Sequence, residues 1–416
     1  MEGKRILFIG GNYYPEPTGV GKYNGEMVDI LAGMGYRCTV ITSYPYYPFW
    51  KIQEPYTKHS KWYKREFKFS PTNLTNPIEI YRCPQFVPHN PNGKSRIILD
   101  FTFFCFSFLK VLELLFRKKY DSVIAIAPCF QIGLLGIFYK LFTGAKFFYH
   151  IQDLQIDAAY ELKMIKSKFL IGMLLKIEKF ILKKADVVSS ISVGMIKKIN
   201  EKYKREIILF PNWVDVKSFY PLEEKMHLKN EFGLNQFDKV VLYSGAIGEK
   251  QGLENILYVA QELNYVANLK FIICGAGPYK EKLKKMASGM QLKNVVFLPI
   301  QPQEKLNNLL NMADIHLVLQ KATAADLVMP SKLTTILSVG GLAIVAASPG
   351  TNLHQLISGN GVGIIINPES KNSLFHAIEN VLKNNCENIK RNARKYAEDF
   401  LSIEIVFPKY VSYMQV

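Results

Sequence analysis

Four short segments of the sequence have residue types suited to binding a phosphate group. Each follows a short apolar run that is typical of a strand, and three of them contain glycines that let backbone N–H groups approach an anion. The fourth places a serine and a lysine just before a predicted helix. The segments are 10–22, 244–250, 275–278 and 329–332, and their candidate residues are Gly19, Gly21, Gly245, Lys250, Gly275, Gly277, Ser331 and Lys332.

Phosphate binding is one of two interpretations of these segments. Lysine supplies a point charge for phosphate, and glycine loops in both halves with lysines in the second half suit a diphosphate, as in a nucleotide-sugar. The alternative is that the glycines only allow close packing of turns. A dinucleotide fingerprint is not met, because the run from Gly19 to Asn24 lacks the third glycine and no acidic residue ends the second strand at Thr42 and Ser43.

The elements that must position these segments are strands and helices in alternation. Short apolar runs recur between helix-compatible stretches, which is the order of a βαβ unit in a parallel sheet. The runs are 5–9, 39–42, 122–126, 146–149, 187–191 and 207–210 in the first half, and 239–243, 269–274, 295–298, 315–319, 342–346 and 362–366 in the second. The predicted fold class is α/β, with two doubly wound Rossmann-like domains.

The length of 416 residues also indicates two domains, since single domains rarely exceed roughly 250–300 residues. We expect a first domain at 1–205 that faces the membrane and a second substrate, and a second domain at 206–399 that binds the phosphate-bearing ligand. A tail from about 400 to 416 is expected to pack back on the first domain. Open α/β sheets bind ligands at the carboxyl ends of their strands, so the ligand is expected in a cleft between the two domains.

The positive charge is concentrated in the first half of the chain. The formal net charge is +17, and residues 1–200 hold 28 Lys and Arg against 15 Asp and Glu. A basic surface attracts anionic lipid, anionic substrates or nucleic acid. Lipid is favoured over nucleic acid, because 44–69 interleaves aromatic and basic residues and 97–116 is almost wholly apolar. Three charged residues in 97–116 argue against a membrane span. The alternative to lipid binding is that 97–116 is a buried helix and 44–69 a solvated loop.

Other features bear on compartment and cofactors. The N-terminus lacks the apolar core of a signal peptide, which predicts a cytoplasmic protein. The six scattered cysteines have no metal-ligand spacing and are expected to be reduced thiols. No D-x-D sequence occurs, so an acidic pair that could carry a divalent ion at that spacing is missing. Neither a metal nor a cofactor is expected.

The order of the motifs is similar to that of glycosyltransferase family 4, whose members are retaining enzymes with the two-domain GT-B fold. The likeness covers nearly the whole chain and is greatest to bacterial colanic-acid-type fucosyltransferases. It is carried by 14–23 (YPEPTGVGKY), 45–48 (PYYP), 149–153 (YHIQD), 211–215 (PNWVD), 243–254 (YSGAIGEKQGLE) and 324–334 (AADLVMPSKLT).

The resemblance implies a role for His150, which the sequence alone leaves open. A single histidine near a strand end is often a structural residue. Family 4 enzymes use the matching histidine to contact the transferred sugar, and Asp153 is expected to be a second polar contact. The family also implies that the sugar keeps its anomeric configuration, through same-face attack in which the leaving phosphate oxygen takes the acceptor proton.

The sequence departs from the family where the donor is held. The family's arginine after the first strand of the second domain is replaced by Ala246, and its second glutamate by Thr335. We therefore expect Lys332, with Lys321, to supply charge for the diphosphate. Asp326 or Thr335 is expected to touch the ribose or the sugar.

Together these features predict a metal-independent, retaining glycosyltransferase on the inner face of a bacterial membrane. Its donor is expected to be a nucleotide-sugar, with GDP-fucose or another deoxyhexose donor first, and its acceptor a lipid-diphosphate-linked saccharide. One alternative is a GT-B nucleotide-sugar epimerase, which binds the same donor without an acceptor. Another is a non-enzymatic basic protein that binds lipid or nucleic acid and whose glycine loops are structural.

Overall fold

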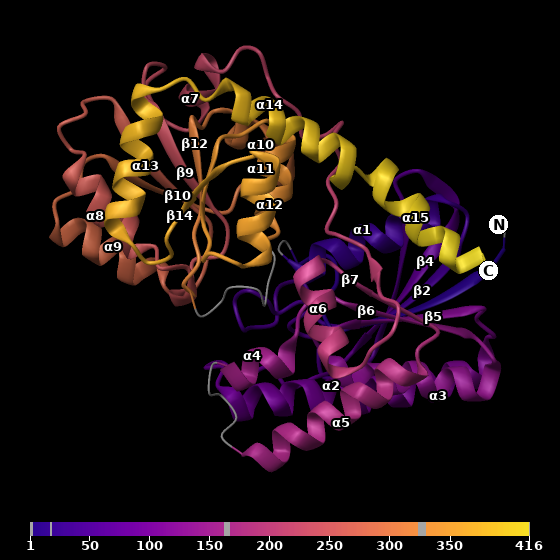
Figure 1. Cartoon of the computed structure of the whole chain (residues 1–416). Coiled ribbons are helices and arrows are strands. Elements are labelled where there is room, and N and C mark those ends of the chain that lie inside the picture. The colour runs from indigo at the N-terminus through magenta and orange to yellow at the C-terminus, as the bar shows by residue number, and fades with distance from the viewer. Residues whose placement is uncertain (1–2, 17–18, 162–166, 323–329, 416) are drawn as a thin grey trace. The chain divides into compact units, whose positions relative to one another are not determined.

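The computed structural model describes residues 3–16, 19–161, 167–322 and 330–415 (Figure 1). Contacts within the chain divide it into two compact units. Unit 1 runs from the N-terminus to Phe210 and includes the last residues from Tyr413 onward, whereas unit 2 is Pro211–Ser412. The boundary therefore falls directly after the last strand of unit 1.

Unit 1 is built on an eight-stranded sheet in the order β3-β4-β2-β1-β5-β6-β7-β8. All neighbouring strands are parallel except β3, which runs antiparallel to β4. The strands are β1 Arg5–Gly10, β2 Arg37–Ser43, β3 Lys64–Ser70, β4 Asn73–Cys83, β5 Ser122–Ala127, β6 Lys146–Ile151, β7 Val187–Ser190 and β8 Ile208–Leu209. All six residues of β5 are buried, which explains why it reads as a continuous apolar run without alternation.

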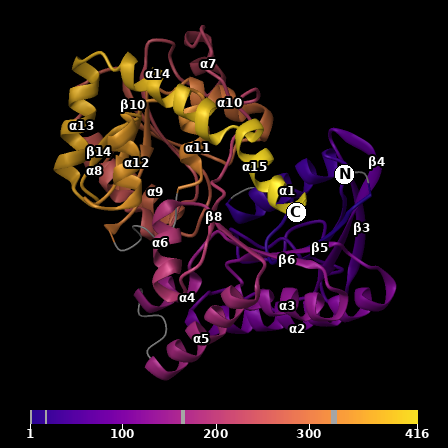
Figure 2. The ribbon, with the colours of Figure 1, turned by 45° about the vertical axis from the view of Figure 1, so that its right-hand side comes forward.

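Helices cover both faces of this sheet. Helices α2, α3 and α5 lie together on one face, and α1 lies on the other (Figures 1 and 2). Helix α3 approaches β6 closely because Gly136 has no side chain: a Cβ there would lie 2.2 Å from the Phe147 ring. The helices are α1 Val20–Gly33, α2 Gly93–Arg117, α3 Gly133–Thr143, α4 Gln155–Glu161, α5 Lys168–Lys184 and α6 Val193–Lys202.

The β3–β4 hairpin corrects one expectation from the sequence. The stretch 44–69 was expected to be a membrane-facing or solvated loop, but its last part forms β3, which pairs with β4 from Lys64 to Ser70. Side chains along β3 alternate between half-buried and exposed, as in a two-faced edge strand. On the adjacent strand, Arg82 is buried and bonds to Glu66 at 2.7 Å. This ion pair joins β3 to β4.

Helix α2 has one buried and one exposed apolar face. Asn92 caps its start by accepting a hydrogen bond from the Ser95 N–H. The buried face includes Leu99, Phe103, Val111 and Leu114, whereas Phe101 and Phe116 are 61% and 82% exposed. Within the described residues, no helix is long and apolar enough to span a membrane.

Unit 2 contains a fully parallel sheet of six strands in the order β11-β10-β9-β12-β13-β14. The strands are β9 Lys239–Ser244, β10 Leu269–Cys274, β11 Val295–Leu298, β12 Ile315–Val318, β13 Ala343–Ala346 and β14 Ile364–Ile366. Two apolar clusters, one containing Leu242 and the other Tyr243, form the core. Neighbouring residues of β9 therefore contribute to different clusters, because side chains alternate across a strand.

The helices of unit 2 follow the same alternation. They are α7 Met226–Glu231, α8 Glu254–Glu262, α9 Lys280–Gly289, α10 Gln303–Asn311, α11 Lys332–Ser338, α12 Asn352–Asn360, α13 Lys371–Lys383, α14 Glu387–Tyr396 and α15 Ile403–Gln415. A π-helical turn at Ala397–Leu401 joins the last two. Val214, just after the unit boundary, forms a bridge with Ser402, and the Trp213 ring packs edge-on against Phe407. The end of the chain therefore anchors the start of unit 2.

Candidate active site

The glycine loops after β9 and β10 in unit 2 are joined backbone to backbone. The N–H of Ile247 donates to the carbonyl of Ala276 at 2.8 Å. A Cβ on Gly275 would lie 1.9 Å from the Gly245 carbonyl oxygen, and one on Gly277 would lie 2.1 Å from the Ile247 oxygen. The three glycines also have φ of 144°, 148° and 155°, a region that other residues rarely adopt. The two loops are therefore held at the carboxyl edge of the sheet in a geometry that requires glycine.

Lys332 extends over this loop pair from the first position of α11. Its Nζ lies 3.5 Å from the centre of the Tyr243 ring and 3.4 Å from where a Cβ on Gly245 would be. The Nζ atom is shielded from solvent and has no hydrogen-bond partner among the described residues. Burial lowers the pKa of Lys332 from 10.5 to about 7.

Tyr243 connects Lys332 to the loop. Its hydroxyl donates to the Ala246 carbonyl at 2.6 Å, while the face of its ring supports the ammonium. A cation–π contact of this kind contributes about 2 kcal/mol when desolvated, which offsets only part of the cost of burying a charge. A bound anion would offset the rest of this cost, and the N–H groups of a glycine loop are suited to binding a phosphate.

The other predicted donor-binding residues of unit 2 occupy different positions around Lys332. Ser331 directly precedes α11, and the buried Thr335 hydroxyl donates to the Lys332 carbonyl at 3.0 Å. The Lys250 side chain is exposed, and its carbonyl accepts a bond from the Lys321 N–H at 2.9 Å. Asp326 lies outside the described residues. The structure therefore brings Gly245, Gly275, Gly277 and Lys332 together and places Lys250 on the surface beyond them.

The glycine loop of unit 1 is occupied by a carboxyl group of the protein itself. A Cβ on Gly21 would lie 2.7 Å from Cβ of Glu16, which is buried. Glu16 accepts hydrogen bonds from the Asn12 amide at 2.8 Å and from the backbone N–H groups of Tyr46 and Tyr47, both at 3.0 Å. Burial raises the pKa of Glu16 to about 7. Packing against Glu16 accounts for the glycine at 21, and the sequence analysis did not identify this acid.

Gly19 has a different position in the same loop. It caps α1 with φ of 57°, and among the described residues beyond its chain neighbours no heavy atom lies within 4 Å of where its Cβ would be. A positive φ explains glycine here without any ligand.

His150 lies near the carboxyl end of β6 and is fully buried. Its Nδ1 is 2.9 Å from the Ser189 hydroxyl oxygen of the adjacent β7, and its ring meets Phe210 edge-on at 5.2 Å. Burial lowers the pKa of His150 to about 3, so the imidazole is neutral at physiological pH. A neutral ring can exchange hydrogen bonds with a sugar but does not supply a positive charge.

An amide network joins this strand end to the first glycine loop. The Gln152 side chain donates to Asn24 Oδ1 at 3.0 Å, and the Asn24 amide donates to the Asn12 carbonyl at 2.8 Å. Burial raises the pKa of Tyr47, and the charge of the half-buried Asp153 raises it further. His150, Asp153 and the loop containing Gly21 therefore lie at one edge of the unit 1 sheet.

Comparison with solved structures defines the fold class. Anabaena HepE, solved in complex with UDP and glucose, aligns with a TM-score of 0.70 and 14% identity over 100% of both chains. WaaG, described as a glycosyltransferase involved in lipopolysaccharide biosynthesis, aligns with a TM-score of 0.69 and 14% identity over 98% of this chain and 99% of its own. The architecture is GT-B, which confirms the predicted fold class.

Sequence comparison defines the family. Residues 224–398 match the family described as "Glycosyl transferases group 1". Over 98% of its length the chain is 38% identical to an Escherichia coli K12 protein, of which 99% is covered, named "Putative colanic acid biosynthesis glycosyl transferase WcaI". The chain belongs to the group 1 glycosyltransferases. The predicted likeness to a glycosyltransferase of the colanic-acid type is thereby confirmed at family level.

Replacing Lys332 by Met is expected to separate stability from ligand binding. Because the folded chain lowers the Lys332 pKa, burial of its charge destabilises the fold below about pH 7, and this penalty disappears as pH rises toward about 10.4. The Lys332→Met chain should therefore unfold at a higher temperature than the wild type, more so at about pH 6.5 than at about pH 9.5. Its affinity for UDP or GDP should fall about 10- to 100-fold.

Thermal unfolding and calorimetric titration measure these two effects. Lys285→Met, at an exposed position of α9, is the matched control and should change neither. Loss of stability with unchanged nucleotide affinity would assign Lys332 a purely structural role.

Proposed function

We propose that this protein is a retaining glycosyltransferase that moves a sugar from a nucleotide diphosphate sugar to a lipid-diphosphate-linked saccharide in bacterial surface polysaccharide synthesis. The observation that carries the proposal is the shielded Lys332 ammonium, without a hydrogen-bond partner in the described chain, beside Gly245. Support comes from two relatives: HepE was solved with UDP-glucose, and WcaI is named for colanic acid biosynthesis. The proposed location is the inner face of the membrane.

The donor's diphosphate would lie against the loop pair of Gly245 and Gly275. Lys332 would neutralise one phosphate, while Ser331 and Thr335, together with Asp326, would contact the ribose or the sugar. Lys250 would then act from the loop surface rather than within the pair. A deoxyhexose such as fucose, carried by GDP, is the first candidate donor, because the chain resembles colanic-acid-type fucosyltransferases.

The chemistry would rest on electrostatic stabilisation without a metal ion or cofactor. Negative charge develops on the departing diphosphate, and fixed N–H groups and an ammonium stabilise such charge best where water is excluded. Lys332 fits this role because its Nζ is already shielded from water. The acceptor hydroxyl would attack from the face that the leaving group vacates, with its proton passing to a phosphate oxygen. Neutral His150, with Asp153, would orient the sugar.

A panel of nucleotides tests the proposed donor class. GDP, UDP and their sugars are added to the wild-type protein, and the unfolding temperature is measured. A ligand specific for the folded state stabilises it by mass action, about 2.7 kcal/mol at 100 times its dissociation constant. One nucleotide series should raise the unfolding temperature of the wild type and have much less effect on Lys332→Met. If no nucleotide diphosphate shifts the wild type, the proposed function is wrong.

Replacing His150 by Ala tests its role at the sugar. Turnover should fall more than about tenfold, because a hydrogen bond to the reacting sugar is lost, while affinity for the sugar-free nucleotide diphosphate stays within about twofold. His376→Ala, at an exposed position of α13, is the control. An equal loss of turnover and nucleotide affinity would indicate that His150 only maintains the fold.

Unit 1 offers a surface suited to an anionic membrane. Helix α5 exposes Phe169 at 85% and carries several exposed lysines, and it lies on the same face of the sheet as α2 (Figures 1 and 2). In the loop before β3, Trp62 is 78% exposed beside the exposed Lys58 and Lys61. Apolar side chains with basic neighbours are the features of an interfacial anchor.

Salt-dependent binding to vesicles tests this surface. The protein should sediment with anionic vesicles at low salt and be partly released at high salt, since headgroup attraction is screened over about 10 Å at 0.1 M. Lys58→Ser with Lys61→Ser should weaken binding about 10- to 30-fold, at about 1 kcal/mol per charge. Lys64 and Arg65 are left intact, because they pair with Glu66 and Glu79 in the hairpin.

The matched control removes the same charge elsewhere. Lys285→Ser with Lys305→Ser, both exposed in unit 2, should leave vesicle binding unchanged. Wild-type protein that ignores anionic vesicles at low salt would contradict the membrane proposal, whereas equal losses in both double variants would reduce it to an effect of net charge.

A further inference from the structure

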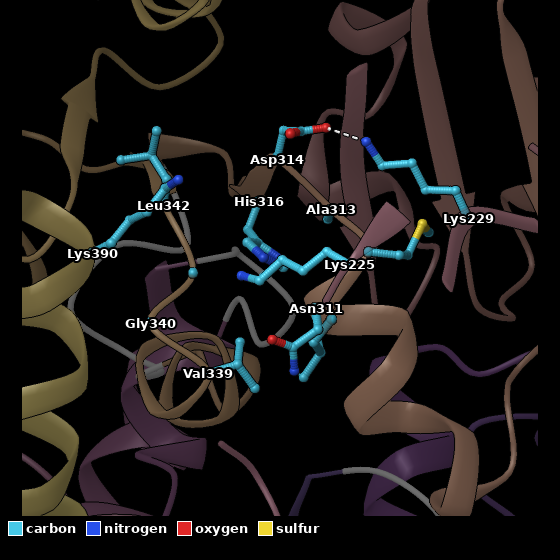
Figure 3. A pocket seen from close by; sticks show the side chains of 13 residues that line it. Lys225, Lys229, Asn311, Ala313, Asp314, His316, Val339, Gly340, Leu342 and Lys390 are labelled. Atoms are coloured by element: carbon cyan, nitrogen blue, oxygen red, sulfur yellow. Dashed lines mark hydrogen bonds and ion pairs between the residues drawn. The ribbon is translucent and has the colours of Figure 1, made fainter. Parts of the chain in front are cut away.

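Unit 2 contains a cavity at the edge of the sheet opposite to the glycine loops. It has a volume of about 60 Å³ and is lined from α7, α10, the start of β12, the turn before β13 and α14 (Figure 3). Because the strands are parallel, the residues that precede β12 and β13 lie at the amino edge, whereas Gly245 and Gly275 follow β9 and β10 at the carboxyl edge. The cavity is therefore separate from the proposed donor site.

His316 forms the buried wall of this cavity. It is 1% exposed, and neither ring nitrogen has a hydrogen-bond partner among the described residues. A Cβ on Gly341 would lie 2.7 Å from the His316 ring, so glycine leaves the ring its space. Burial and the neighbouring Lys225 lower the pKa of His316 to about 3, which keeps it neutral with one N–H donor. A buried polar group without a hydrogen-bond partner lowers the stability of the folded protein, so a ligand that bonds to the ring would be stabilising.

Three lysines surround the ring. Lys229 is buried and donates to the Asp238 carbonyl and, at 3.2 Å, to the Asp314 carboxylate. Lys390, on α14, pairs with Glu387 at 2.8 Å. Lys225 has no ion pair within the described part of the chain, and its side chain runs alongside the His316 ring (Figure 3). Burial and repulsion from Lys390 lower the Lys225 pKa.

We propose that this cavity, here named the Lys225–His316 pocket, binds one inorganic phosphate ion. Lys225 directly precedes α7, His316 lies on β12 and Lys390 lies on α14. Two ammonium groups and one ring N–H from separate parts of the chain suit an oxyanion with several acceptor oxygens. Asp314 is the one carboxylate in the lining, and it is already bonded to Lys229. The three lysines disfavour a metal cation, and a volume of about 60 Å³ has room for several waters or one small anion.

Calorimetric titration of the full chain with inorganic phosphate tests the proposal. Lys332→Met is used as the background, because phosphate can also bind at the proposed donor site. That chain should bind one phosphate, and adding Lys225→Met should weaken the binding at least about tenfold, since a charge-assisted bond is lost. Adding Lys305→Met instead, at an exposed position of α10, should leave it unchanged.

A second readout locates the ion at His316. In protein labelled with ¹⁵N-histidine, the ring signals of His316 should shift as phosphate is added, and those of exposed His376 should not. The absence of phosphate binding in the Lys332→Met chain would overturn the proposal. Equal phosphate affinity with and without Lys225→Met, or an unmoved His316 signal, would also overturn it. None of these outcomes depends on transferase activity, so the proposed function is tested separately.

Discussion

The site in unit 2 depends on one ammonium group that is shielded from water and has no hydrogen-bond partner among the described residues. Removing a charge from water costs several kcal/mol, and the face of the Tyr243 ring returns only part of it. The fold nevertheless places the Lys332 ammonium beside Gly245, where the backbones of two neighbouring loops pack directly against each other. Such an arrangement lowers the stability of the folded protein while the ammonium is charged, and a loss of stability of this kind is common at binding sites.

The two units use similar glycine motifs in different ways. In unit 2 the glycines allow two loops to pack directly against each other next to Lys332. In unit 1 the space beside Gly21 is filled by Glu16, which already holds the N–H groups of Tyr46 and Tyr47. A carboxyl group there would repel phosphate when ionised. Helix α11 adds a connection within unit 2, because it starts at Lys332 and the residues after its end line the Lys225–His316 pocket.

Much of this fold could be predicted from the sequence, because parallel strands buried on both faces are continuous apolar runs such as β5. The position of Lys332 at the carboxyl edge of the sheet could also be predicted, since it lies at the start of a helix that follows a strand. Tyr243 could not, because its contact with Lys332 joins residues far apart in the chain. The β3–β4 hairpin was missed because its charged and aromatic residues alternate as they do in a membrane-facing loop, and Glu16 was missed because its partners are backbone groups.

The direct backbone contact between the two glycine loops has a consequence for how related sequences diverge. The hydrogen bond between Ile247 and Ala276 uses only main-chain atoms, so the path of the loops does not depend on which side chains they carry. Ala246 and Ala276 are half-buried positions within that fixed frame. Substitutions there can alter the shape and charge of the loop surface while the backbone frame stays the same. The path of the loops and the side chains that they present can therefore change independently of each other.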